Sequence, residues 1–526
     1  MKRILTPLFL GFTCYVSAQS LQSTNSASGK ELPIEIKKDW FNLDYKTDKL
    51  YGTSTNKTFA ELIGEKKPKK RIVVAVIDSG VDWEHEDLKD NIWVNTDEIA
   101  GNNIDDDKNG YVDDVHGWNF LVDDDGKDIN VETLEATRIL RLSTEIKDND
   151  GEYPDWLTND LINNALKIYN ESVDELKGLQ VFRMAFAISD SVMLSKFGEG
   201  YEFSEAAELN AENSTAEKQA KFFYEYIDKN GVTMKDLTDM AEHFDEGMLY
   251  QLNMEYVTRK SLTPDQKFYG NNHYEGNAAD HGTHVAGIIA SDRDNAIGSN
   301  GIASDCADIM VVRVVPNGDE HDVDVANGIR YAVDNGANLI NMSFGKGLSP
   351  YKQLVTEAIE YASSKNVLVI HAAGNDNANN DEVENYPNID LVANQDALSF
   401  LTVGALNTEK NKKLLAPFTN YGANSLDIFA PGSDIYSTTP DNEYEFFSGT
   451  SMAAPVVCGV AALVWAYHPE LTALELKNLL IDSSMKLPKK KVILPGTKKD
   501  KVRLIEISKT AGLVNTYNAF MQLQAQ

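Results

Sequence analysis

The stretch RIVVAVIDSG, residues 71–80, restricts the fold of this chain more than any other feature of its sequence. Its six consecutive apolar residues include five β-branched ones, and Asp78 follows them directly. An uninterrupted β-branched run, rather than an alternating one, predicts a strand that is buried on both faces, as in a parallel sheet. Asp78 is then expected at the carboxyl end of that strand, where a carboxylate needs a partner.

Similar apolar runs alternate with helical patterns in the second half of the chain. The runs ADIMVVRVV, ANLINMSFG and VLVIHAAGN are predicted to be strands, and HGTHVAGIIAS, DVANGIRYAVDNG and YKQLVTEAIEYASSKN are predicted to be helices. This alternation, with short loops, predicts an α/β fold with a doubly wound, mostly parallel sheet. Ligands of such sheets collect at the carboxyl ends of the strands, where Asp78, Ser343 and Asn375 would all lie.

Residues 127–270 interrupt this alternation. The segment is acidic and poor in β-branched runs, and apolar residues recur in it at helical spacing. Ser214, with Glu217 three residues later, predicts a helix start, and Gly231 predicts a helix end. We therefore predict a helical subdomain inserted into the α/β core. Its predicted apolar stripe consists of Leu157, Leu161, Ala165, Ile168, Val173 and Leu176.

Composition limits the classes of partner. The chain has 526 residues, of which 42% are apolar, and 49 Lys and Arg stand against 81 Asp and Glu, a net charge of −32. This balance disfavours nucleic acids and anionic membranes, and it suits a soluble protein that binds cations. No run after the first twenty residues is long and uncharged enough for a membrane span, so none is expected. The oligomeric state is left open.

The first twenty residues, MKRILTPLFLGFTCYVSAQS, have the pattern of a secretory signal peptide. Two basic residues precede a short apolar run, and small residues lead to a cleavage site after Ala18. The alternatives are an ordinary buried N-terminal element and a lipid anchor on Cys14, which has a poor sequence context. We expect export to the periplasm, the cell surface or the medium. Cys306 and Cys458 stand in apolar sequence and are expected to be inert core residues.

The predicted domain organisation follows from these patterns. It consists of a signal peptide (1–18), an N-terminal segment (19–70), a first core part (71–126), the acidic helical insertion (127–270) and a second core part with a C-terminal extension (271–526).

The chain contains each group that amide hydrolysis by nucleophilic catalysis requires. That chemistry needs a hydroxyl, a base, a carboxylate that orients the base, and hydrogen-bond donors for the oxyanion. The candidates are Ser451 in SGTSMAAP, His281 or His284 in DHGTHVAG, Asp78, and Asn375 in HAAGNDN. Each alone has a more ordinary explanation, as a helix start, a packing residue or a turn residue. Their joint occurrence is what favours catalysis.

Taken together, the four motifs resemble those of the subtilisin-like serine peptidases, the subtilases. AVIDSGVD is similar to the Asp motif of that family, HGTHVAG to its His motif, AAGN to its oxyanion amide and GTSMAAP to its Ser motif, over about 70–130 and 270–485. The resemblance implies a serine endopeptidase that acts on polypeptides. In it Asp78 would orient the base, His281 would be the general base and acid, Ser451 the nucleophile and Asn375 the oxyanion donor. His284 would then be structural, and we expect no organic cofactor.

The surroundings of Ser451 fit a nucleophile. We expect Gly449 to permit a tight turn, and Pro455 to lie in the first turn of the helix that Ser451 opens. The N-terminus of that helix would direct partial positive charge and free N–H groups at the reacting centre.

Substrate-binding residues are implied by the resemblance. Ser343, Phe344 and Gly345 resemble the strand end that lines the first specificity pocket and pairs with an extended peptide, and Ala373 with Gly374 resembles another wall. A peptide would add a strand there, so that main-chain hydrogen bonds give affinity and pockets give selectivity. For Phe344 alone, a core aromatic is the alternative.

The stretch NNIDDDKNGYVDD begins like a calcium loop. Oxygen-bearing side chains stand at alternate positions, and a glycine then precedes a residue that offers its carbonyl. His116 takes the place of the bidentate glutamate of an EF-hand, so another acid has to close the site. A solvated acidic turn is the alternative, but clustered carboxylates repel one another and favour calcium. The predicted ligands are Asp105, Asp107, Asn109, the Tyr111 carbonyl, and Asp113 or Asp114.

A second calcium site is implied mainly by the resemblance. Asp87 and Asn295 resemble the carboxylate and amide of the family's calcium loop, and Ile297 and Ser299 would add backbone oxygens. A ligand that the family takes from its extreme N-terminus has no match in this chain.

Two features depart from compact subtilases. About fifty residues separate the predicted signal peptide from the core, so no full folded pro-domain is expected. The insertion separates Asp78 from His281 along the chain, which a folded site tolerates if the ends of the insertion lie close together. We hypothesise that the insertion flanks the cleft and narrows substrate choice. The alternatives to a general endopeptidase are a processing peptidase of narrow specificity and a binding protein on an inactive subtilase scaffold.

Overall fold

The computed structural model of the chain contains two compact units, which we describe separately. The core unit comprises Pro33–Glu135 and Val257–Gln526, and the helical unit comprises Ala136–Tyr256. The predicted signal peptide with Cys14, and the predicted helix end at Gly231, lie outside the described residues. The described residues are 32–212, 214–229, 232–260 and 262–525.

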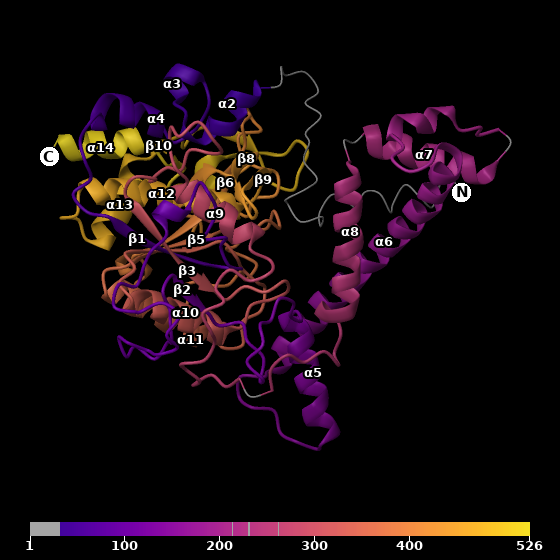
Figure 1. Cartoon of the computed structure of the whole chain (residues 1–526), viewed down its shortest axis with the longest axis horizontal. Helices are drawn as coiled ribbons and strands as arrows, with labels where there is room; N and C mark the ends of the chain where they lie inside the picture. The colour runs from indigo at the N-terminus through magenta and orange to yellow at the C-terminus, as the bar shows by residue number, and fades with distance from the viewer. Residues whose placement is uncertain (1–31, 213, 230–231, 261, 526) are drawn as a thin grey trace. The chain divides into compact units, whose positions relative to one another are not determined.

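A nine-stranded sheet forms the centre of the core unit (Figure 1). Its strands are β1 (Ile72–Asp78), β2 (Gly117–Asn119), β3 (Ala307–Arg313), β4 (Leu339–Met342), β5 (Leu368–Ala372), β6 (Phe400–Leu406), β7 (Ile428–Pro431), β10 (Met485–Lys486) and β13 (Gly512–Leu513). Their order is β10-β13-β7-β6-β5-β4-β1-β3-β2, and every neighbouring pair is parallel except β10 with β13. The predicted doubly wound, mostly parallel α/β fold is confirmed.

Two small antiparallel sheets complete the strands. They pair β8 (Ile435–Thr439) with β9 (Glu443–Phe447), and β11 (Lys491–Ile493) with β12 (Lys501–Arg503).

Helices cover both faces of the large sheet, with α10 and α11 on one face and α9 and α12 on the other (Figure 1). The three helices predicted from HGTHVAGIIAS, DVANGIRYAVDNG and YKQLVTEAIEYASSKN are α9, α10 and α11. The helices of this unit are α2 (Ile34–Asp39), α3 (Tyr45–Asp48), α4 (Thr55–Thr58), α9 (Asp280–Ala290), α10 (Asp322–Asp334), α11 (Lys352–Ser364), α12 (Thr450–Tyr467), α13 (Ala473–Ser483) and α14 (Thr516–Gln524).

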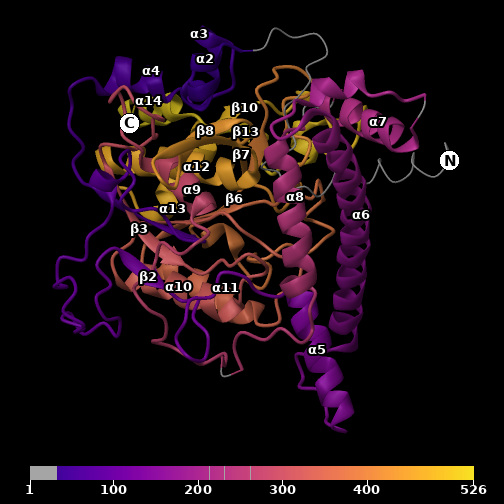
Figure 2. The ribbon, with the colours of Figure 1, turned by 45° about the vertical axis from the view of Figure 1, so that its right-hand side comes forward.

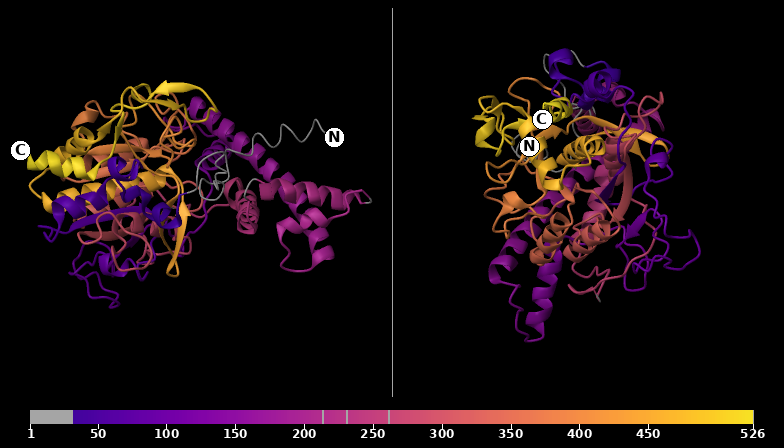
Figure 3. Two further views of the ribbon diagram at one scale, coloured as in Figure 1. Left: turned by 90° about the horizontal axis from the view of Figure 1, so that it is seen from above. Right: turned by 90° about the vertical axis from the view of Figure 1, so that its left-hand side faces the viewer.

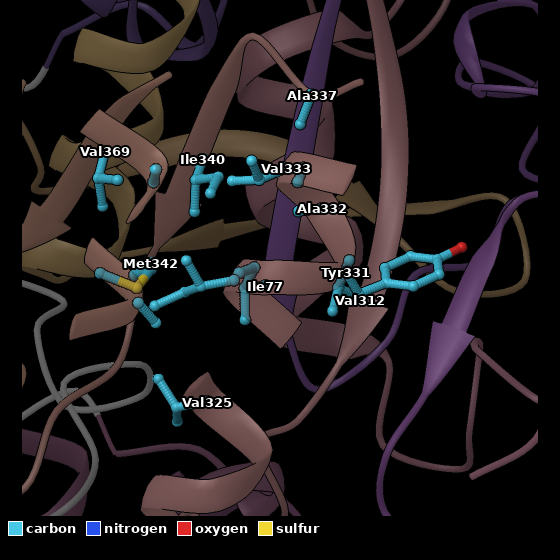
Figure 4. Packing of buried hydrophobic residues seen from close by; sticks show 14 of the residues in the cluster. Ile77, Val312, Val325, Tyr331, Ala332, Val333, Ala337, Ile340, Met342 and Val369 are labelled. Atoms are coloured by element: carbon cyan, nitrogen blue, oxygen red, sulfur yellow. The ribbon is translucent and has the colours of Figure 1, made fainter. Parts of the chain in front are cut away.

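The central strands are apolar on both faces because both faces are covered. Ile77 of β1 lies in one buried cluster with Val312 of β3, Met342 of β4 and Val325 of α10 (Figure 4). Successive side chains of a strand point to opposite faces, so Val76 serves the face that carries α9 and α12. This two-sided burial is why the sequence of β1 shows no alternation.

The connections of the sheet reverse direction at β1. The chain passes from β1 to β3 on one side of it, and then returns from β3 past β1 to β4 on the other side. After β1 the next core helix is α9, and after β4 it is α11, which lie on opposite faces (Figure 1). Loops that diverge in this way leave a crevice at the carboxyl ends of the two strands, and ligand sites of open α/β sheets form there.

The helix α12 crosses the interior of the core unit. Within the described part of the chain it is the one helix long and apolar enough to pass for a membrane span by length and composition. Its window is 94% buried inside the protein, as expected of a core helix. The buried Cys458 lies on it, and Cys306 is buried before β3, as predicted for inert core residues.

The helical unit is built around α6 (Asn159–Phe197), a helix of 39 residues. Figure 2 shows α6 beside α8 (Met234–Glu246), and α7 (Thr215–Lys229) packs against its carboxyl half around a small apolar cluster. Within the predicted stripe, Leu157, Ala165 and Leu176 are buried. The unit also contains α5 (Glu135–Asp148), whose first residue belongs to the core unit, and two short helices of other types, Phe203–Glu208 and Gly247–Gln251.

The predicted start of α7 at Ser214 is confirmed. The Glu217 N–H donates to Ser214 Oγ at 3.2 Å. The Glu217 carboxylate accepts from the Asn210 N–H at 2.6 Å, so it secures the preceding loop.

The helical unit is shorter than the predicted insertion, 127–270. Residues before Ala136 pair with the core: Glu132 N–H donates to Asn317 O at 2.9 Å. Residues after Tyr256 do the same, because Arg259 forms a buried ion pair with Asp324 of α10. These flanks lack apolar periodicity and are held by polar pairing, which the helical pattern of the sequence does not reveal.

The N-terminal segment is part of the core unit. Trp40 is fully buried, and its Nε1–H donates to Ser433 O at 3.1 Å. The helix α4 lies beside the C-terminal helix α14 (Figure 3), where Thr55 and Thr516 share a hydrogen bond of 3.0 Å. Segments from the two ends of the chain thus close the same side of the sheet.

Candidate active site

The end of β1 and the start of α9 bring Asp78 and His281 together. The Nδ1–H of His281 donates to Oδ1 of Asp78 at 2.7 Å, and this oxygen also accepts from the Ser79 N–H at 2.8 Å. Burial acts to lower the pKa of His281, but the charge and hydrogen bond of the buried Asp78 outweigh it, so the pKa is raised. Close approach requires glycine next to the histidine, because a Cβ at Gly282 would lie 2.0 Å from Gly80 O.

Ser451 is the second residue of α12 and is joined to Ser343 by two hydrogen bonds. Ser451 Oγ–H donates to Ser343 O at 3.0 Å, and Ser343 Oγ–H donates to Ser451 O at 2.8 Å. Pro455, four residues on, has no N–H for the Ser451 carbonyl, which is therefore free to accept from Ser343. Pro455 lies in the second turn of α12, not in the first as predicted, and its missing donor ties the helix to the end of β4.

Asn375 follows β5 and is held by the residue before Ser451. Its Oδ1 accepts from the Thr450 N–H at 2.8 Å and from Thr450 Oγ1–H at 3.0 Å. With the oxygen so engaged, Nδ2 is the atom left for a ligand. Gly449 has an extended backbone (φ 169°, ψ 163°), so the prediction of a tight turn at this glycine is wrong. A Cβ there would lie 3.5 Å from Asn375 Nδ2.

His284 is a buried structural residue, as the resemblance implied. Its Nε2–H faces Ile435 O at 3.1 Å and Glu445 O at 3.2 Å, and its ring stacks on Phe447. Burial lowers the pKa of His284 to about 3, so the imidazole is neutral.

The residues 343–346, which follow β4, form an extended segment that we call the 343–346 segment. The ring of Phe344 is half-buried against the core cluster, and its carbonyl accepts from the Nε2–H of His371 at 2.9 Å. The Lys346 N–H donates to Tyr386 O at 3.0 Å, and the Tyr386 N–H donates to Lys346 O at 2.9 Å. Gly345 is exposed between them, and a Cβ there would lie 2.9 Å from Tyr386 O.

The loop after β5 lies near the 343–346 segment through Asn385. A Cβ on Gly345 would lie 3.1 Å from Asn385 Oδ1, and Asn385 Nδ2–H donates to Ala373 O at 3.0 Å. Gly374 has φ +101°, which favours glycine, and its N–H donates to Thr450 Oγ1 at 3.1 Å. The structure therefore brings the two predicted walls of the pocket to one place.

The acidic loop 98–114 differs from the predicted ligand set. Carboxylate oxygens of Glu98, Asp105 and Asp107 lie within 4.8 Å of one another. Glu98 was missed, because it stands seven residues before the alternating pattern that marks the loop. Gly110 has φ +99°, as a sharp turn requires.

The two acids expected to close this loop have other partners. Asp113 accepts hydrogen bonds from the backbone N–H groups of Gly101 and Asn103 at 2.9 and 2.8 Å. Asp114 accepts from Asn109 Nδ2–H at 3.0 Å and from Tyr331 O–H at 2.7 Å. Burial raises the pKa of Asp114 to about 6. Glu98 likewise accepts from backbone N–H groups, those of Asp106 at 2.8 Å and Asp113 at 3.2 Å.

Two further predicted ligands of this loop take part in its own hydrogen bonds. Asn109 Oδ1 accepts from the Tyr111 N–H at 2.8 Å, so the turn is closed by side chain and backbone together.

The second predicted cation loop brings its residues together. Asp87 Oδ1 accepts from Asn295 Nδ2–H at 2.6 Å, and Asp87 Oδ2 accepts from the Ser299 N–H at 3.2 Å. Asn295 Oδ1 accepts from the Ile297 N–H at 3.1 Å. Burial raises the pKa of Asp87 to about 6.

A parallel α/β sheet that carries an Asp–His pair, a serine at a helix start and a side-chain amide beside it defines a protein of the nucleophilic hydrolase class. Comparison with known proteins narrows this class. The subtilase family matches residues 69–504. The chain therefore belongs to the subtilase family.

Individual relatives match about two fifths of the chain. The cell wall-associated protease of Bacillus subtilis (strain 168) is 39% identical over 40% of this chain and 22% of its own length. Subtilisin DY of Bacillus licheniformis is 36% identical over 42% of this chain and 76% of its own length. A solved structure of a cold adapted subtilisin-like serine proteinase is 30% identical, covers 45% of this chain and 72% of that one, and has a TM-score of 0.34.

Proposed function

We propose that the chain is a serine endopeptidase that hydrolyses polypeptides through Ser451, His281 and Asp78. The observation that carries this is the Asp78–His281 hydrogen bond of 2.7 Å at the end of β1. Ser451 of α12 is in turn hydrogen-bonded to Ser343, which follows the neighbouring strand β4. Membership of the subtilase family supports the reaction class.

The proposed mechanism starts with the tautomer of His281. Since Nδ1 carries the proton donated to Asp78, Nε2 is the basic nitrogen that takes the Ser451 hydroxyl proton. The hydroxyl must first turn away from Ser343 O, to which it donates at 3.0 Å. Ser451 Oγ then attacks the carbonyl carbon of the substrate, and the protonated His281 later gives its proton to the leaving amine.

The oxyanion is stabilised in this proposal by Asn375 Nδ2–H and by the N-terminal turn of α12. The Asn375 amide is oriented by Thr450, which is itself the first residue of α12. Donors fixed before the reaction cost little reorganisation, and one such donor contributes about 10²–10³ in turnover.

We also propose that calcium binds the core unit. Three carboxylates within 4.8 Å repel one another unless a cation lies between them, so Glu98, Asp105 and Asp107 fit a calcium site. For the second loop, turning the Asn295 amide by 180° would present Oδ1 instead of Nδ2 beside Asp87, and the Ile297 carbonyl could join it. The Ser299 carbonyl accepts from Ser291 Oγ–H at 3.1 Å and has a second lone pair for the ion. Bound calcium would serve as a structural ion.

Export is part of the same proposal. The pattern of the first twenty residues supports it, and so does the similarity to the cell wall-associated protease of Bacillus subtilis.

The proposal is tested by labelling with a fluorophosphonate probe, which reacts with activated serines. We expect the wild type to be labelled and the Ser451→Ala variant not to be labelled. Ser433→Ala serves as a control, because Ser433 belongs to the same unit but has no part in the proposed chemistry. A wild type that takes up no label, or a Ser451→Ala variant that does, contradicts the proposal and favours a binding protein on an inactive scaffold.

A further inference from the structure

Lys346 is a buried cation at the end of the 343–346 segment. Its Nζ–H donates to the Glu135 carboxylate at 2.8 Å and to Glu320 O at 2.6 Å, and lies 2.9 Å from Asp322 Oδ1. The side chain of Lys346 is 2% exposed, and those of Glu135 and Asp322 are 9% and 4% exposed. An ammonium group has three N–H donors, and here each has an oxygen in reach.

The partners of Lys346 belong to different elements. Glu135 is the first residue of α5 and the last core residue before the helical unit. Asp322 is the first residue of α10, where a carboxylate is stabilised by the helix dipole, and it also accepts from Ser349 Oγ–H at 2.8 Å. One side chain therefore joins the 343–346 segment to the start of α10 and to the point where the chain leaves the core.

The energetics indicate that the cluster around Lys346 positions the elements it joins, rather than raising the free energy of unfolding. Two buried carboxylates and a buried ammonium have a large desolvation cost, so such a cluster adds little net stability over an apolar one of the same size. Its hydrogen bonds are directional, however, and they hold only when the three elements keep their spacing. Removing the cation would leave two buried carboxylates without their shared partner.

The main chain of Lys346 leads directly to the proposed reacting groups. Both its N–H and its carbonyl are bonded to Tyr386, so the residue is fixed by backbone and side chain together. Three residues earlier, Ser343 O accepts from Ser451 Oγ–H. A shift of Lys346 would therefore displace Phe344 and Gly345, the stretch that a strand-adding peptide would pair with.

We propose that Lys346 is a positioning residue for extended polypeptides: its buried cluster with Glu135 and Asp322 fixes the 343–346 segment as a template strand. The inference rests on the proposed function and adds to it a determinant of peptide binding. It predicts that loss of the cluster weakens the binding of long peptides and leaves the chemistry at Ser451 intact.

Kinetics with two substrates separate these effects. We compare a tetrapeptide anilide with a single-residue anilide. Both carry the same residue at the cleaved bond, namely the one that is cleaved fastest in a series of anilides. In Lys346→Met we expect KM for the tetrapeptide to rise about tenfold with kcat little changed. KM for the single-residue substrate should rise by a smaller factor, because that substrate forms fewer main-chain hydrogen bonds with the 343–346 segment. Lys346→Arg should raise the tetrapeptide KM less than Lys346→Met does, because arginine keeps the charge and the hydrogen-bond donors.

Two further variants guard against a trivial loss of folding. Lys477→Met removes another buried lysine, which donates to Leu398 O at 2.8 Å, and it should lower the unfolding midpoint without changing either KM. Glu135→Gln keeps a hydrogen-bonding side chain and leaves Lys346 paired with Asp322, so it should fold and raise the tetrapeptide KM about threefold. Equal effects of Lys346→Met on both substrates, or an unchanged tetrapeptide KM in Glu135→Gln, would overturn the proposal.

A binding measurement keeps this inference distinct from the proposed reaction. The Kd of the same tetrapeptide, as its carboxylic acid, is measured by calorimetry in Ser451→Ala with and without Lys346→Met. An increase of about tenfold supports the positioning role even if the wild type takes up no fluorophosphonate. An unchanged Kd, or no binding in either protein, overturns it while leaving the fluorophosphonate result to decide the reaction.

Discussion

The helices α12 and α6 show how differently the two units are built. In α12, 16 of 18 residues are buried, whereas in α6 only four of 39 are. A helix such as α12 is held by the sheet and helices on every side, so its position is fixed to within the packing of the core. A helix such as α6 is held along one stripe and at one end by a small cluster around Phe223 and Tyr224. The proposed nucleophile lies on the first kind of helix, where position is most strongly determined.

The largest effect is expected from a change that keeps the packing of the core and removes only its chemistry. Asp78→Asn preserves shape but cannot stabilise the imidazolium or fix the same tautomer of His281, so kcat/KM should fall about 10⁴-fold. Asp427→Asn is the control, because Asp427 is also buried and pairs with Lys509 far from the site along the sheet.

The pH profile gives a second measurement on the same variant. Activity needs the neutral imidazole, so it is lost as pH falls through the pKa of His281, which Asp78 raises. The remaining activity of Asp78→Asn should therefore have its acid limb at lower pH than the wild type. A limb that stays in place would contradict the role given to Asp78.

Removing a buried ring should destabilise different parts of the molecule, depending on the unit to which the ring belongs. Phe429→Ala in β7 and Phe223→Ala in α7 each remove a buried ring, at a cost of about 3–5 kcal/mol. We expect Phe429→Ala to reduce both hydrogen-exchange protection of the sheet and fluorophosphonate labelling. Phe223→Ala should reduce protection of α6 and α7 alone and leave labelling intact. Loss of labelling in Phe223→Ala would show that the units do not fold independently.

Calcium should stabilise the core unit and not the helical unit, because both proposed sites belong to the core unit. Chelation is expected to lower the unfolding midpoint of the core, since an ion at 100 times its Kd adds about 2.7 kcal/mol. The variant Glu98→Gln should lose part of this response, and exchange in α6 should not respond. A midpoint that chelation leaves unmoved would count against both sites.

The smallest effect on the chemistry is expected from removing the helical unit itself. Replacing Ala136–Tyr256 by a short Gly-Ser linker should leave labelling of Ser451 unchanged, because Thr258 Oγ1–H donates to the Glu132 carboxylate and so already joins the two ends. If the insertion narrows substrate choice, the rates on folded proteins and on peptides should change by different factors. Equal factors would contradict that hypothesis.

The sequence predicted well those elements whose burial leaves a recognisable pattern of apolar residues. The strands β1, β3, β4 and β5 appear as continuous apolar runs because the sheet is covered on both faces. The strand ends then place Asp78, Ser343 and Asn375 without further assumption, since parallel strands share one carboxyl edge.

What the sequence did not predict depends on single hydrogen bonds. Glu98 is held beside Asp105 and Asp107 by the backbone N–H groups of Asp106 and Asp113, which no sequence pattern marks. The ends of the insertion were missed for the same reason, because polar pairing such as that of Glu132 leaves no periodic signal.

The absence of one hydrogen atom at Pro455 has a mechanical consequence for the whole site. In an ordinary helix the Ser451 carbonyl would be used within α12, and the helix could slide or turn against the sheet with its own bonds intact. Here that carbonyl is bonded to Ser343 Oγ–H, so any such movement breaks a bond between the two elements. The proline thus helps to fix the position of Ser451, the proposed nucleophile, relative to the strand beside which a substrate would lie.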